Sequence, residues 1–70
     1  MDVVTLKAVI AKLEQEVKHC HEMIRWAISE ERDEKAIDMW CNSKVQAQHC
    51  LNKVQDMLDS ELFDRATEAA

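Results

Sequence analysis

The sequence predicts an all-α protein, an antiparallel two-helix coiled-coil hairpin whose core is completed by oligomerisation or by a partner helix. Three observations support this prediction: the lack of helix-breaking residues, the spacing of apolar residues in each half, and the match between the two halves. None of the 70 residues is Gly or Pro. Apolar residues in each half recur at alternating spacings of three and four, which is the period of a coiled-coil face. The row in the first half consists of Val3, Leu6, Ile10, Leu13, Val17, Cys20, Ile24 and Ala27.

The second row matches the first when the chain folds back near Arg32. It consists of Ile37, Trp40, Lys44, Ala47, Leu51, Val54 and Leu58. Ala27 then meets Ile37 at one end of the seam, and Leu6 meets Leu58 at the other. The two residue numbers of every pair have the same sum, so one bend brings all layers together. The predicted hairpin core is Leu6, Ile10, Leu13, Val17, Cys20, Ile24, Ile37, Trp40, Ala47, Leu51, Val54 and Leu58.

The expected organisation is a single hairpin domain over residues 1–70. It comprises a helix over 2–28, a turn over 29–34, a helix over 34–63 and a frayed tail over 64–70. Asp2 and Asp33 precede the two helices and are suitable N-caps, because a carboxylate accepts hydrogen bonds from unpaired backbone N–H groups there. The turn coincides with a polar run, residues 29–35, in which every side chain is charged or hydroxylic.

One continuous helix is the alternative, because the turn lacks Gly and Pro. Extending the first row straight through would place Glu31, Glu34 and Asp38 in the core. Burying unpaired carboxylates is costly, so the hairpin is favoured. Two residues are unusual in its seam. Lys44 lies opposite Cys20, where its stem can pack or fix the register, and Trp40 is larger than one layer requires.

Composition excludes several classes of function. The chain is 47% hydrophobic and 33% charged, with a net charge of −5. It holds no apolar run long enough for a membrane span, and its cations are dispersed, which argues against binding to nucleic acid or to a membrane surface. The N-terminus shows no secretory signal. We therefore expect a cytoplasmic protein.

The cysteines and histidines give weak signals for chemistry. Three cysteines make no disulfide framework, and we expect packing thiols. His19 and His21 diverge on a helix, and His49 lies more than a helical turn from them in the predicted register, so we predict no metal and no cofactor. A metal or redox role is kept as a minor alternative. His49 and Cys50 do not face each other as a nucleophile and base would. We predict that the chain is not an enzyme.

More apolar residues are present than a two-helix seam can cover. Exposed apolar surface usually marks an interface, and Met and Trp are frequent in such places. We therefore predict a protein-interaction module that binds a copy of itself or another helical chain. The partner-interface candidates are Met23, Trp26, Met39, Val45, Met57, Leu62 and Phe63.

Residues 33–40, Asp-Glu-Lys-Ala-Ile-Asp-Met-Trp, open the second helix directly after the charged turn. With the length and the hairpin pattern, this segment resembles the small co-chaperones of type III secretion needle subunits. The resemblance implies a cytosolic hairpin that pairs with a tetratricopeptide-like chaperone and keeps the needle subunit soluble and monomeric before export. Lys44 and the three cysteines have no counterpart in that pattern. The alternative is a homodimeric hairpin regulator or a phage-type inhibitor of a host protein.

Overall fold

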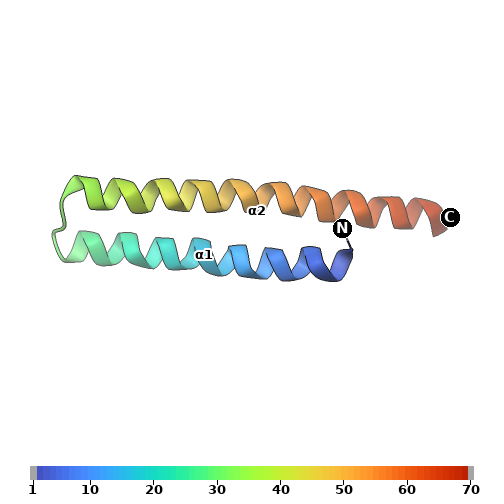
Figure 1. Cartoon of the computed structure of the whole chain (residues 1–70), viewed down its shortest axis with the longest axis horizontal. Helices are drawn as coiled ribbons and strands as arrows, with labels where there is room; N and C mark the ends of the chain where they lie inside the picture. The colour runs from blue at the N-terminus through green and yellow to red at the C-terminus, as the bar shows by residue number, and fades with distance from the viewer. Residues whose placement is uncertain (1, 70) are drawn as a thin grey trace.

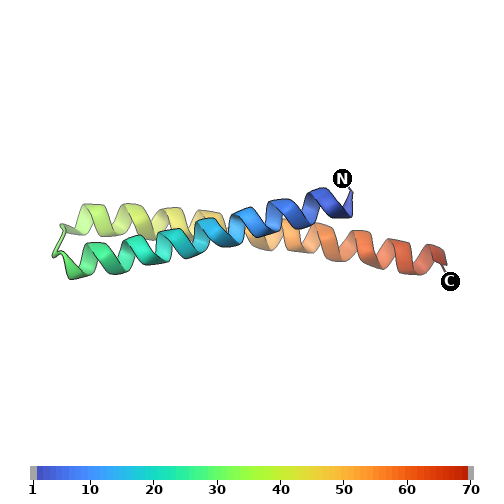
Figure 2. The same ribbon diagram turned by 90° about the horizontal axis from the view of Figure 1, so that it is seen from below.

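The chain forms an antiparallel helical hairpin (Figure 1). The computed structural model describes residues 2–69, which comprise α1 (Val3–Ser29) and α2 (Glu34–Ala69), joined by residues 30–33. The two helices lie side by side along the whole of α1 and cross at a shallow angle (Figure 2). The body measures 57 × 15 × 14 Å. The predicted all-α hairpin is therefore confirmed, and the continuous helix is excluded.

Both helices begin at the predicted aspartates. Asp2 Oδ1 accepts a hydrogen bond of 2.8 Å from the Thr5 backbone N–H, and Thr5 Oγ1 donates to Asp2 Oδ2 over 3.1 Å. Asp33 Oδ1 accepts one of 2.9 Å from the Ala36 backbone N–H. Each carboxylate thus satisfies an N–H group that has no partner within its helix.

The turn is built without glycine. Glu31 has a φ of 53°, in the left-handed region that favours glycine. Its backbone N–H donates to Ile28 O over 3.1 Å, and the Arg32 N–H donates to Ala27 O over 2.9 Å. These two bonds form a Schellman motif, which ends α1 by pairing its last free carbonyl groups. Four residues then separate the helices, so α2 returns along the seam.

The seam between the helices forms the core. Among the described residues, Ala27 is 0% exposed and Leu6 is 2% exposed, and Ile10, Cys20 and Leu51 are also buried. A seam between two helices is one layer thick, so solvent reaches most of its side chains from the edges. The remaining residues of the predicted core are half-buried: Leu13, Val17, Ile24, Ile37, Trp40, Ala47, Val54 and Leu58.

Helix α2 is longer than the sequence analysis predicts. A frayed tail is expected from residue 64, but α2 continues to Ala69, and Ala70 lies outside the described residues. No helix-breaking residue follows Phe63, and each added residue extends the hydrogen-bonded ladder at little cost. Thr67 Oγ1 donates to Phe63 O over 2.9 Å, and Arg65 Nε lies 4.0 Å from Glu61 Oε1.

Neither α1 nor α2, the two helices of the described segment 2–69, is long and apolar enough to cross a membrane.

Replacing Glu31 by Gly should stabilise the hairpin by about 0.5–1 kcal/mol, because Gly adopts a positive φ without strain from a Cβ atom. Urea unfolding at a fixed protein concentration measures the gain. Glu31→Gln controls for the lost charge, and Glu30→Gly controls for added backbone freedom, since φ at Glu30 is −89°. Neither control should stabilise the chain. Equal stability of Glu31→Gly and the parent would contradict a strained turn.

Acid should weaken the N-terminus of α1. The backbone and hydroxyl hydrogen bonds from Thr5 lower the pKa of Asp2 below its ordinary value of 3.8. A lowered pKa stabilises the fold above pH 3.8, and this contribution is lost as the pH falls through the folded-state pKa. Asn is an equally good N-cap that does not titrate. The stability difference between the parent and Asp2→Asn, measured by thermal unfolding across the acid range, should therefore shift in favour of Asp2→Asn. A stability difference that does not change with pH would contradict the role of Asp2 as the N-cap of α1.

Candidate protein-interaction surface

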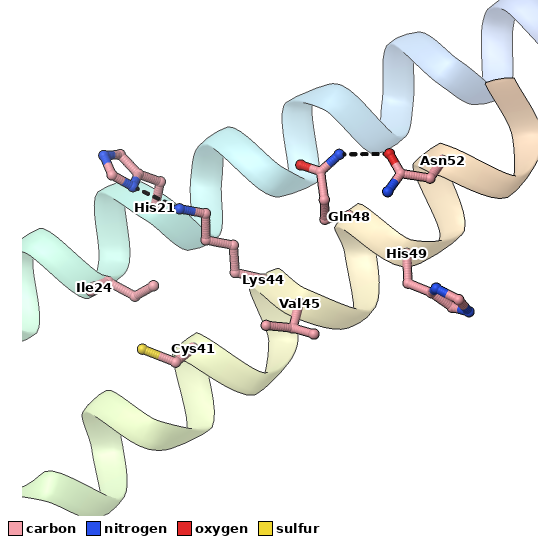
Figure 3. Close-up of a pocket in the computed structure, with 8 residues that line it drawn as sticks. All are labelled: His21, Ile24, Cys41, Lys44, Val45, Gln48, His49 and Asn52. Atoms are coloured by element: carbon pink, nitrogen blue, oxygen red, sulfur yellow. Dashed lines mark hydrogen bonds between the residues drawn. The ribbon is translucent and has the colours of Figure 1, made fainter.

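Among residues 2–69, a groove lies beside the seam on each edge of the hairpin. One groove, of about 650 Å³, lies on what we term the Val45 edge (Figure 3). Helix α1 contributes His21 and Ile24 to it, and α2 contributes the rest. The α2 side chains Gln48 and Asn52 are joined by a hydrogen bond of 3.0 Å, while His49 points away from α1. The lining residues are His21, Ile24, Cys41, Lys44, Val45, Gln48, His49 and Asn52.

Lys44 crosses from the seam to this edge. Its side chain is half-buried, and its Nζ lies 3.2 Å from Nδ1 of His21 (Figure 3). An ammonium group only donates, so His21 Nδ1 is the acceptor in this contact. This arrangement explains how a lysine can occupy a position in the apolar seam. The stem of Lys44 packs between the helices, and its charged end reaches a partner at the rim.

The opposite groove, of about 450 Å³, lies on what we term the His19 edge. Here the ring of His19 meets that of Trp40 edge-on, with centroids 5.8 Å apart and an interplanar angle of 85°. This contact covers part of the large seam residue Trp40, which is half-buried. The groove is lined by Lys12, Gln15, Glu16, His19, Cys20, Ser43 and Ala47.

Six of the seven partner-interface candidates lie on one of the two edges, and the seventh lies on the outer face of α2. Residues seven apart share one face of a coiled-coil helix. Met23 follows Glu16 by one heptad, Trp26 follows His19 by one, and Met57 follows Ser43 by two, so these residues continue the His19 edge. Met39 joins them, one helical turn before Ser43. By the same spacing, Leu62 continues the Val45 edge from Gln48. Phe63 follows His49 by two heptads and lies on the outer face of α2.

Exposure differs among these candidates. Met23 is half-buried. Trp26 is 43% exposed, Met39 56% and Met57 47%, all on the His19 edge. The guanidinium carbon of Arg32 lies 4.9 Å from the centre of the Trp26 ring, a cation–π contact that ties this side chain to the turn. The His19 edge therefore carries a fixed indole and three flexible thioethers.

The partner-interface candidates leave out three exposed apolar residues, of which Val9 and Ile28 flank the predicted seam and Val4 does not. Val4 is 79% exposed, Ile28 59% and Val9 36%. Val4 and Ile28 are not part of the row that packs between the helices. An apolar residue outside that row is the sequence signal that identifies them as exposed. Val9 precedes Glu16 by one heptad and extends the His19 edge towards the open end of the hairpin.

The side chains suited to chemistry are dispersed. Cys20 is buried, Cys41 is half-buried and Cys50 is exposed. Among residues 2–69, no group of three His, Cys, Asp or Glu side chains is placed to hold a metal ion.

Comparisons with protein-family models, with curated proteins and with solved structures find no match to this chain.

Replacing Lys44 by Met should raise the free energy of unfolding by about 1 kcal/mol, because an apolar chain of similar length fills the seam without desolvating a charge. Chemical unfolding at a fixed protein concentration measures the change. Lys53→Met is the matched control, since Lys53 is exposed on the same helix, and it should change stability by less than about 0.5 kcal/mol. A destabilised Lys44→Met would mean that the bond to His21 outweighs apolar burial.

Proposed function

We propose that the chain is a protein-interaction module whose His19 edge packs against helices of another protein. The observation that carries this proposal is the exposure of Trp26 and Met39 near the turn and of Met57 towards the open end, all on one edge of the hairpin. Large apolar side chains in water raise the free energy of the isolated chain, and covering them with a partner helix removes that cost.

The residue types suit this role. Methionine is flexible and polarisable, so Met23, Met39 and Met57 can adapt to the ridges of a partner helix. Tryptophan buries a large area and is frequent among the residues that dominate binding energy. Arg32 restrains Trp26 before binding, which reduces the entropy lost on association.

The resemblance to type III secretion needle co-chaperones supports a specific form of the proposal. The hairpin would join a tetratricopeptide-like chaperone and cover a helical face of the needle subunit, keeping that subunit soluble and monomeric before export. This action is binding alone and requires no catalytic group. The hairpin fold agrees with what the resemblance implies, and the row of apolar residues supplies a surface for the contact.

A homodimeric regulator or phage-type inhibitor is the second candidate. Val45 is 67% exposed and Leu62 is 44% exposed on the edge opposite the methionines. Apolar residues on both edges suit a hairpin packed between helices on two sides, as in a four-helix bundle. Sedimentation equilibrium of the chain alone should then show dimers.

Co-expression tests the first candidate. The chain, a tetratricopeptide-type chaperone and a needle subunit should elute together from gel filtration. Met39→Ser should weaken the complex about tenfold or more, because it removes an apolar contact from the His19 edge. Val45→Ser is the matched control on the opposite edge and should leave the affinity nearly unchanged. Three separate peaks would reject the co-chaperone. A chain that is also monomeric at high concentration would reject the homodimer.

A further inference from the structure

The end of α2 projects beyond α1. Helix α1 has 27 residues and α2 has 36, which correspond to lengths of about 40 and 54 Å at 1.5 Å per residue. The register that pairs Leu6 with Leu58 places Val3 opposite Glu61. Residues 62–69 therefore extend past the first residue of α1, and Figures 1 and 2 both show this segment continuing alone.

The projecting segment has an apolar face. Leu62 is 44% exposed and Phe63 is 71% exposed. Ala66, also exposed, lies one turn further along the same face. Val4, at the same end of the hairpin, is 79% exposed. We call Leu62, Phe63 and Ala66 the C-terminal ledge. Phe63 and Ala66 lie in the segment that extends past α1, and Leu62 lies level with the start of α1, so among the described residues α1 leaves all three exposed.

Charge distinguishes this end from the rest of the molecule. Residues 56–69 contain five carboxylates, on Asp56, Asp59, Glu61, Asp64 and Glu68, and one cation, Arg65, a net charge of −4. The rest of the chain contains nine carboxylates and eight cations. Nearly all of the net charge of −5 is thus concentrated here.

The positions of these charges indicate which kind of partner could bind the C-terminal ledge. Asp56 and Asp59 precede Phe63 by seven and four residues, so they lie on the same face as the ledge. The last turn of α2 has no basic residue, although the C-terminal end of a helix dipole favours cations. A cationic partner would relieve this local repulsion, whereas the same segment of a second copy would add to it.

We propose that the C-terminal ledge is a docking site for an amphipathic helix of another protein that carries Lys or Arg beside its apolar stripe. The apolar stripe covers Leu62 and Phe63, and the cations face Asp56 and Asp59, while Asp64 adds to the negative charge of this end. This inference rests on the proposed interaction function and adds a second contact, of defined chemistry, at the opposite end of the hairpin from Trp26.

A titration of the full ¹⁵N-labelled chain with two synthetic helical peptides tests the proposal. The peptides share one leucine stripe, and their remaining positions are all Lys in one and all Glu in the other. The Lys peptide should shift the amide resonances of residues 56–69, slow the hydrogen exchange of residues 62–68, and bind more weakly as salt is added. The Glu peptide should not bind. Shifts centred on another part of the chain, equal binding of both peptides, or no binding would overturn the proposal.

Substitutions test the charged part and the apolar part of the docking site separately. Asp56→Asn, Asp59→Asn and Asp64→Asn together should weaken binding of the Lys peptide about tenfold, by removing two charge contacts and a third negative charge from this end. The matched control replaces three exposed glutamates of α1, Glu14, Glu16 and Glu22, by Gln. This control should weaken binding of the Lys peptide less than about twofold. Leu62→Ser with Phe63→Ser should weaken it at least about tenfold, with helix content checked by circular dichroism. An unchanged affinity in either ledge variant would reject the site.

The peptide titration can reject the C-terminal ledge as a docking site without rejecting the proposed function. If the Lys peptide fails to bind while the co-expressed complex forms and Met39→Ser weakens it, the interaction module stands and the ledge is rejected as a docking site.

Discussion

Everything in this hairpin depends on reversing the chain within residues 30–33, without glycine. Glu31 adopts a left-handed backbone conformation, which costs about 1 kcal/mol or more for a residue with a Cβ atom. The hydrogen bonds from Glu31 and Arg32 back to α1, the contact of Arg32 with Trp26, and the Asp33 cap of α2 offset this strain. Because the reversal occurs at one place, a single register holds from Ala27 at the turn to Leu6 at the open end.

A seam one layer thick limits how much apolar surface the chain can bury. Its buried residues, such as Leu6 and Leu51, lie between the helices, while the side chains at their margins remain open to solvent on both edges. The seam also tolerates Lys44, because its charged end reaches His21 at the rim. The geometry that restricts the core thus produces the surface on which the proposed function depends.

The two ends of the molecule differ in chemistry. Near the turn, the Trp26 indole is held by Arg32 on the same edge as Met23 and Met39. At the open end, an uncovered helix carries leucine and phenylalanine beside most of the net negative charge. A helical partner that contacted both ends would bind in one direction only, since its apolar and cationic residues must lie at matching ends.

The sequence by itself determined the fold class, the bend point, both N-caps and the identity of the seam residues, because heptad spacing and capping chemistry are local and repeat along the chain. It also showed that apolar residues exceeded what the seam could cover. Only the tertiary structure decided where the two edges lie, that Lys44 reaches His21, and that α2 extends past α1. Those features depend on how two helices lie against each other, and heptad spacing assigns a residue to an edge only once that packing is known.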